Sequence, residues 1–170
     1  MRMTIKNSGN IILIYFLLAQ IANFFLPDRP IWDERLFIDE VMRFGDLYLP
    51  GLVEIRNMQS PMGPVYFIVY GFFGKLVGFS IFWMRSIHIA ITIAFLFVIR
   101  EFLADCKNRG LLILVFILNP YFLVMTGPLM YTDVIGLLLV YLGLLLYDRP
   151  YGWLLSGLFW GMAISTRQLF

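Results

Sequence analysis

The sequence predicts an all-α fold: a transmembrane helical bundle with about five crossings and additional amphipathic helices outside the membrane. The first observation is composition, since 61% of the 170 residues are hydrophobic and only 14% are charged. Soluble domains average about 45–50% apolar and about 25% charged residues. A soluble domain of this length has too much surface for its volume to bury the excess. Lipid is therefore the expected solvent.

The second observation is the recurrence of apolar segments close to the length of about 20 residues that crosses a bilayer. They cover residues 10–26, 81–99, 110–130, 132–147 and 151–166. Residues 61–79 are also apolar, but this segment contains four glycines and a lysine and begins with two closely spaced prolines. That pattern predicts a Gly-rich helix that starts at its prolines.

The third observation is the distribution of charge. Seven of the eleven acidic residues lie between residues 27 and 60, which predicts a polar loop there. Lys and Arg in short loops favour the cytoplasm, and they occur near the N-terminus, in 100–109 and at Arg149. These positions agree only if 61–79 does not cross the membrane. We therefore expect one transmembrane domain over 1–170, with a first crossing at 10–26, an external loop over 27–80, four further crossings within 81–166 and a cytoplasmic N-terminus.

The external loop has helical periodicity of its own. Phe37, Val41 and Phe44 follow i, i+4, i+7 spacing, and charged residues fill the other faces. Gly45 is placed to end this helix. We expect an amphipathic helix parallel to the membrane surface.

Several classes of function are excluded by composition. A net charge of +2 is too small to indicate the excess of Lys and Arg that nucleic-acid binding requires. Cys106 is the only cysteine and His88 the only histidine, which excludes an intrachain disulfide and metal sites built from several of these residues. We expect no cofactor and no metal site, and we interpret His88 as a polar contact between packed helices.

Three short motifs, called steps below, are candidate functional sites. The first is Trp32-Asp33-Glu34, between the first apolar segment and the amphipathic helix. Acids at a helix start lie at the positive end of the helix dipole. A carboxylate that faces a lipid-borne substrate at the membrane surface has the chemistry of a general base. Helix capping by Asp33 is the simpler interpretation of the local sequence.

The second step is Tyr131-Thr132-Asp133, which the expected threading puts on the same outer side as Asp33. A carboxylate so close to hydrocarbon is costly unless it is solvated or has a function. Helix capping by Thr132 or Asp133 is again the simpler local interpretation.

The third step, Ser165-Thr166-Arg167-Gln168, ends the last apolar segment on the outer side. The guanidinium of Arg167 has a planar fork of donors suited to phosphate. Snorkelling at a helix end is the simpler interpretation. Arg85, near the outer start of 81–99, has the same two interpretations and could also pair with an external acid.

Although each step alone favours its simpler interpretation, their order resembles the N-terminal half of the GT-C superfamily of membrane glycosyltransferases. Within it, Asp33-Glu34, Tyr131-Thr132-Asp133 and Arg167-Gln168 look like steps of the dolichyl-phosphate-glucose α-1,2-glucosyltransferases of N-glycan assembly. Members of the superfamily are longer. The chain therefore looks like an N-terminal portion: the product of a truncated gene, one piece of a split protein that a second chain completes, or a degenerate copy. A GT-C-like fragment with no activity is a further interpretation.

The resemblance implies transfer of a sugar from a polyprenyl- or dolichyl-phosphate carrier to an acceptor glycan, lipid or protein. The reaction would take place on the non-cytoplasmic side of a bacterial or archaeal plasma membrane or of the endoplasmic reticulum. The resemblance assigns the catalytic base to Asp33, with Glu34 assisting it or positioning the acceptor.

The resemblance also assigns substrate-binding roles. Asp133 would orient the sugar or the acceptor, and Arg167 with Gln168, together with Arg85, would hold the carrier phosphate. The alternative is a non-catalytic multi-pass membrane protein, such as a transporter subunit or a scaffold, with small residues facing a partner.

Overall fold

The computed structural model describes residues 5–31, 34–47, 52–57, 63–120, 122–123 and 133–166. All the regular elements in these residues are α-helices, as the sequence predicts. They are α1 (Ile5–Phe25), α2 (Glu34–Leu47), α3 (Leu52–Arg56), α4 (Pro64–Val77), α5 (Ile81–Phe102), α6 (Arg109–Ile117), α8 (Asp133–Tyr147) and α9 (Gly152–Ile164).

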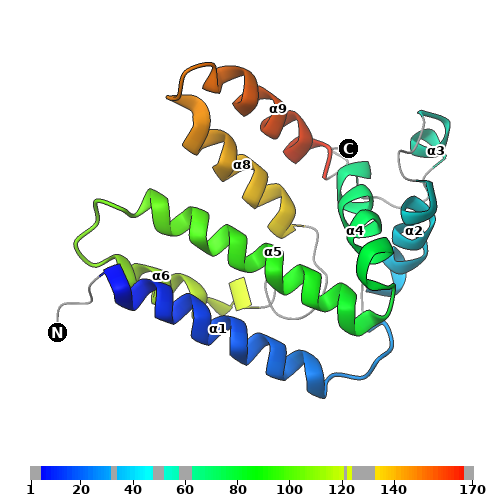
Figure 1. Ribbon diagram of the computed structural model, residues 1–170, viewed down its shortest axis with the longest axis horizontal. Coiled ribbons are helices and arrows are strands. Elements are labelled where there is room, and N and C mark those ends of the chain that lie inside the picture. Colours follow the sequence, from blue (N-terminus) through cyan, green and yellow to red (C-terminus); the bar gives the residue numbers. More distant parts are fainter. Residues whose placement is uncertain are drawn as a thin grey trace.

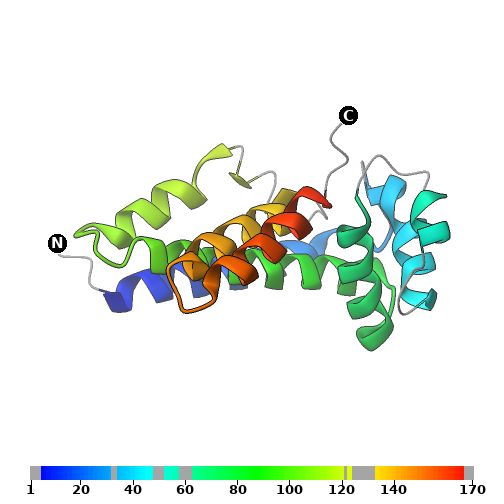
Figure 2. The same cartoon turned by 90° about the horizontal axis from the view of Figure 1, so that it is seen from above.

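The 22-residue helix α5 is the central element, and the other helices are arranged around it (Figure 1). Helices α1 and α6 pack together along one flank of α5, while α8 packs along another and forms a hairpin with α9. Helices α2 and α4 form a pair at the end where α5 begins, and the view from above shows this pair set apart from the long helices (Figure 2).

Two helices have the length and apolar character needed to cross a bilayer: α1, over Ser8–Phe25, and α5, over Ile81–Phe102. Helices α4, α8 and α9 are apolar but have only 14, 15 and 13 residues. A helix of that length spans about 20 Å, less than the hydrocarbon thickness of about 30 Å. The expected number of five crossings is therefore not confirmed, and residues 121 and 124–130 of the expected segment 110–130 lie outside the described residues.

The amphipathic segment forms α2, but its apolar face does not lie open. Phe37, Val41 and Phe44 are buried against Tyr66 and Phe67 of α4 in one hydrophobic cluster. Burial of three such side chains favours the pairing by several kcal/mol, at about 1.5–3 kcal/mol each. The stripe expected to face the membrane surface is therefore occupied by α4.

Gly45 does not end α2, which continues to Leu47. The expectation of a helix stop there was wrong because Gly45 serves a close approach between helices. A Cβ on Gly45 would lie 2.9 Å from the carbonyl oxygen of Gly71, and a Cβ on Gly71 would lie 2.6 Å from the amide nitrogen of Gly45. The two glycines let the backbones of α2 and α4 meet without side chains between them.

Candidate functional site

A buried ion pair joins the start of α2 to the start of α5. Nε of Arg85 donates to Oε1 of Glu34 at 2.8 Å, and Nη2 donates to Oε2 at 2.7 Å. The side chains of Arg85 and Glu34 are only 1% and 2% exposed. This two-point geometry matches the fork of a guanidinium to the two oxygens of a carboxylate.

The same two side chains also form hydrogen bonds with the backbone of the connection between α1 and α2. Nη1 of Arg85 donates to the carbonyl oxygen of Pro27 at 2.9 Å, and Nη2 donates to that of Arg29 at 3.2 Å. The Glu34 carboxylate accepts a hydrogen bond from the backbone N–H of Ile31 at 2.9 Å. Arg85 and Glu34, the residue that follows Asp33, therefore fix the conformation of residues 27–31.

Further polar contacts attach the end of α1 to the start of α5. Nδ2 of Asn23 donates to the carbonyl oxygen of Phe82 at 3.1 Å and to Oγ of Ser86 at 3.2 Å. Oδ1 of Asp28 accepts from the backbone N–H of Phe82 at 3.3 Å, which satisfies one of the unpaired donors at the start of a helix. These contacts hold the ion pair at one end of the bundle.

Two tyrosines of α4 pack beside the ion pair. The hydroxyl of Tyr70 lies 2.6 Å from Nδ1 of His88 on α5, so His88 forms the interhelical polar contact predicted from the sequence. Burial, and secondarily the nearby Glu34 carboxylate, raises the pKa of the Tyr66 hydroxyl well above its usual value. Tyr66 is therefore a neutral hydroxyl close to a buried carboxylate.

The start of α4 is joined to the end of α9 through the backbone. The N–H of Gly63 donates to the carbonyl oxygen of Thr166 at 3.1 Å, and the N–H of Val65 donates to that of Ser165 at 3.3 Å. A Cβ on Gly63 would lie 1.9 Å from the Ser165 carbonyl oxygen, so only glycine fits there. The unpaired donors of one helix start thus meet the unpaired acceptors of another helix end.

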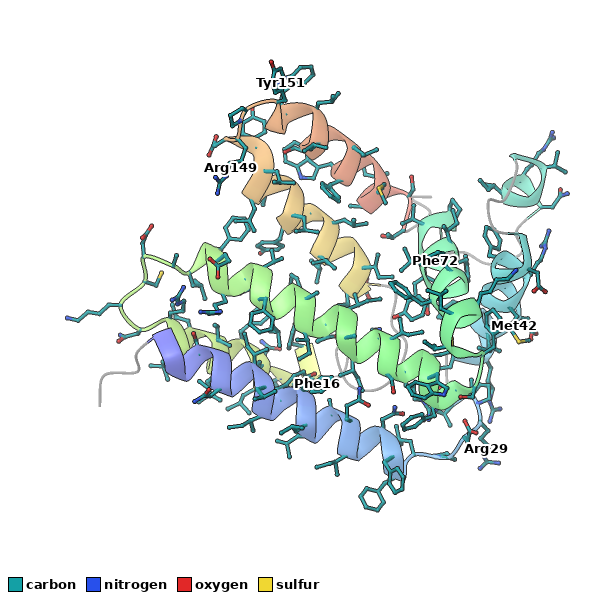
Figure 3. The ribbon with its side chains drawn as sticks, in the orientation of Figure 1. Phe16, Arg29, Met42, Phe72, Arg149 and Tyr151 are labelled. Carbon is teal, nitrogen blue, oxygen red and sulfur yellow. The ribbon has the colours of Figure 1, made fainter. Side chains whose placement is uncertain are left out.

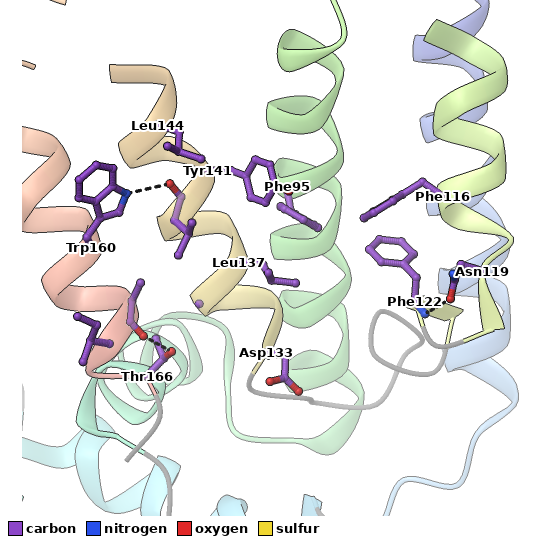
Figure 4. Close-up of a pocket in the computed structure, with 14 residues that line it drawn as sticks. Phe95, Phe116, Asn119, Phe122, Asp133, Leu137, Tyr141, Leu144, Trp160 and Thr166 are labelled. Atoms are coloured by element: carbon purple, nitrogen blue, oxygen red, sulfur yellow. Dashed lines mark hydrogen bonds between the residues drawn. The ribbon is translucent and has the colours of Figure 1, made fainter. Parts of the chain in front are cut away.

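A cavity of about 800 Å³ lies among α5, α6, α8 and α9. Asp133 and Thr166 line it at one end, and Trp160 and Leu144 lie toward the other end (Figure 4). Most of the remaining lining residues are apolar or aromatic: Phe95, Phe116, Phe122, Gly136, Leu137, Val140, Tyr141, Ala163 and Ile164, with Asn119 as a further polar residue. Oγ1 of Thr166 donates to the carbonyl oxygen of Ala163 at 2.7 Å.

Helix α4 is linked to the described residues of two of the three steps. Its Tyr66 lies close enough to Glu34 for the carboxylate charge to raise the pKa of the tyrosine hydroxyl, and the N–H of the adjacent Val65 donates to the carbonyl oxygen of Ser165. Ile135, two residues after Asp133, belongs to the same hydrophobic cluster as Phe37, three residues after Glu34. Asp133 and Thr166 therefore line one cavity, and Glu34 lies near α4, whose start is hydrogen-bonded to the end of α9.

The remaining predicted site residues, Asp33, Arg167 and Gln168, lie outside the described residues. Their neighbours Glu34 and Thr166 are described, and the roles of all the predicted residues stay predictions. The junction of Gly63 with Ser165 was not predicted, because hydrogen bonds between main-chain groups leave no signal in residue type. Within the described ranges, no group of three or more His, Cys, Asp or Glu residues is placed to hold a metal ion.

Comparison of the chain with protein-family models, curated proteins and solved structures finds no match. The resemblance to GT-C enzymes therefore rests on the three short steps and on their order along the chain.

Proposed function

We propose that this chain is a glycosyltransferase-like membrane protein of the GT-C type, or the N-terminal part of one. It would transfer a sugar from a polyprenyl-phosphate carrier to an acceptor on the non-cytoplasmic side of the membrane. The observation that carries the proposal is that Asp133 and Thr166, from two of the predicted steps, line one cavity. The end of α9 is also hydrogen-bonded to the start of α4, whose Tyr66 lies near Glu34 of the first step.

Exposed apolar surface supports the membrane part of the proposal. On α1, Phe24 and Phe25 are 73% and 80% exposed, and Leu18 is 61% exposed. On α9, Trp153 and Leu154 are exposed to a similar degree. Continuous apolar surface of this kind is rare on soluble monomers, but it is the normal surface of a protein in lipid.

The directions of the helices support the proposed threading. Arg149 and Tyr151 mark the tip of the α8–α9 hairpin, whereas Arg29 lies at the opposite end of the molecule (Figure 3). The connection from α5 to α6, with its basic residues, lies at the end where α1 begins (Figure 1). In the proposed threading α1, α6 and α9 run outward and α5 and α8 run inward, while α2 and α4 stay outside.

The proposed chemistry is an in-line displacement at the anomeric carbon of the sugar. The acceptor oxygen forms a bond to that carbon while Asp33 takes the hydroxyl proton. The bond from the carbon to the phosphate oxygen breaks, and the lipid phosphate leaves with the electron pair. Arg167 and Gln168 stabilise the leaving charge, as preorganised donors do.

The contacts of Arg85 refine its proposed role. Its four hydrogen bonds go to Glu34, Pro27 and Arg29. Arg85 therefore acts through Glu34 as a positioning residue for the segment before α2, and Arg167 supplies the main contact to the phosphate. Asp133, at the end of the cavity, orients the sugar or the acceptor.

One observation favours the alternative of a non-catalytic scaffold or transporter subunit. Gly157 and Gly161 stand four residues apart on α9, and a Cβ on either would meet no atom within 4 Å. This spacing resembles the small-residue surface at which transmembrane helices associate. Cross-linking through a cysteine at position 157 would detect such a partner.

The decisive experiment is a transfer assay in membranes that contain the chain. Radiolabelled glucose and mannose on dolichyl phosphate and on undecaprenyl phosphate would be supplied as donors, and label would be followed into lipid, glycan and protein. Asp33→Asn should reduce transfer by at least about 100-fold, as expected for loss of a general base. The matched control is Asp39→Asn, an exposed acid on α2, which should keep full transfer. Transfer that persists in Asp33→Asn would refute the proposed mechanism.

A further inference from the structure

The cavity between α8, α9, α5 and α6 has a polar end with a distinct hydrogen-bonding character. The Asp133 carboxylate lines it, and an ionised carboxylate only accepts hydrogen bonds. The hydroxyl of Thr166 uses its hydrogen on the carbonyl oxygen of Ala163, so its oxygen presents lone pairs. These two side chains therefore offer acceptor oxygens to a ligand that donates hydrogen bonds.

The rest of the cavity suits a hydrocarbon chain. Aromatic rings of Phe95 and Phe116 stand on one flank, and Leu137 and Trp160 stand on the other (Figure 4). A volume of about 800 Å³ is in the range of sites that enclose a small organic molecule, about 300–1,000 Å³. An apolar lining with few polar groups at one end is the usual design of such a site.

We propose that this cavity binds a single-chain amphiphile with an uncharged, hydroxyl-bearing head, with its chain among the aromatic side chains and its hydroxyls at Asp133 and Thr166. A phosphate head is disfavoured because it adds negative charge beside a carboxylate and offers acceptors to acceptors. The polar lining comes from three separate parts of the chain: Asp133 at the start of α8, Thr166 just after α9 and Asn119 just after α6. Such spacing suits several hydroxyls pointing in different directions better than the compact charge of an ammonium group.

The proposal does not depend on sugar transfer, because it concerns binding alone. Trp160 lines the cavity and provides the reporter, since bromine atoms on a lipid chain quench a tryptophan that they contact. A chain with Trp160 as its only tryptophan (Trp32→Phe, Trp83→Phe, Trp153→Phe) would be placed in phosphatidylcholine nanodiscs. Three probes with the same brominated chain would be titrated: a monoacylglycerol, a lysophosphatidic acid and an alkyltrimethylammonium.

The monoacylglycerol should quench Trp160 saturably, and excess unbrominated monoacylglycerol should reverse the quenching. The lysophosphatidic acid should bind at least about tenfold more weakly than the monoacylglycerol, because repulsion replaces a charge-assisted hydrogen bond. Asp133→Asn should remove most of this discrimination. Val140→Phe, which fills part of the cavity from a partly exposed lining position, should weaken all binding.

Two outcomes would overturn the proposal. Quenching that rises linearly and equally with all three probes would mean that the chains only partition into the bilayer. Tightest binding of the ammonium probe would show that the polar end recognises a cation instead. Because neither readout requires a reaction, a negative transfer assay leaves this test unaffected.

Discussion

Arg85 and Glu34, 51 residues apart in the chain, share two hydrogen bonds of 2.8 and 2.7 Å with almost no exposure to solvent. Removal of two charges from water costs several kcal/mol per ion, and only excellent geometry with additional hydrogen bonds offsets that cost. The carbonyl oxygens of Pro27 and Arg29 and the N–H of Ile31 supply those additional bonds. The pair therefore fixes the backbone that leads into Asp33.

Removal of one member of this pair should destabilise the protein strongly. Arg85→Met leaves the Glu34 carboxylate buried without its counter-charge, which should cost about 3–5 kcal/mol of unfolding free energy. The double variant Arg85→Met with Glu34→Met should recover most of the loss, because no unpaired charge remains. Unfolding in mixed detergent micelles would measure both effects.

The matched control is the pair of Arg43 and Glu40 on α2, which are joined at 3.4 Å with the Arg43 side chain 41% exposed. Arg43→Met should change the unfolding free energy by no more than about 1 kcal/mol. Equal losses in Arg85→Met and Arg43→Met would contradict the structural role given to the buried pair.

The hydrogen bond between Tyr70 and His88 should also contribute to stability. Tyr70→Phe keeps the ring in the core formed by α2 and α4 but leaves a buried ring nitrogen of His88 without this partner. The expected loss is about 1–3 kcal/mol. Tyr151→Phe, which changes a tyrosine that is 80% exposed, should have no measurable effect in the same unfolding assay. A Tyr70→Phe variant as stable as Tyr151→Phe would show that the contact contributes nothing.

Much of the helical pattern followed from the sequence because apolar periodicity and chain breakers are local signals. The predicted segment 132–147 corresponds to α8 over Asp133–Tyr147, and 61–79 contains α4, which starts at Pro64 as its proline predicts. The partner of an amphipathic face is not a local property. The burial of Phe37 and Val41 against α4 rather than at a membrane surface could not be derived from the spacing of these residues alone.

The candidate site was predicted only in part, because residue types are visible in the sequence but contacts between distant helices are not. The unusual positions of Glu34, Arg85 and Asp133 are visible in the sequence, because charged groups next to apolar segments are costly. Which acid pairs with Arg85 depends on how α1, α2 and α5 meet, and several acids of the 27–60 stretch were equally available. The cavity at Asp133 is formed by four helices and has no sequence signature.

The junction between α4 and α9 predicts that position 63 tolerates no side chain. Gly63→Ala would place a Cβ 1.9 Å from the carbonyl oxygen of Ser165, so the contact must open. The two hydrogen bonds of Gly63 and Val65 would be lost with it, at about 0.5–1.5 kcal/mol each. Exposure of a cysteine at position 166 to maleimide should rise in this variant, since Thr166 is only 2% exposed.

Gly157→Ala provides the control for this substitution, because its Cβ would meet no atom within 4 Å. An added methyl group in the middle of a helix should leave stability unchanged or raise it by about 0.5–1 kcal/mol. If Gly63→Ala behaved like Gly157→Ala, the close contact between α4 and α9 would not exist in the protein.

The threading predicts which loops share a side of the membrane, and Cys106 is a native reporter of it. Cys106 is exposed in the connection between α5 and α6. A membrane-impermeant maleimide added to intact cells should therefore fail to label it. In a Cys106→Ser background, Arg149→Cys at the hairpin tip should be equally protected, while Arg29→Cys at the other end should be labelled. Permeabilised cells should label all three cysteines. Labelling of Arg149→Cys together with Arg29→Cys in intact cells would show that the hairpin tip lies on the outer side, and it would refute the proposed threading, in which α8 crosses inward from Asp133.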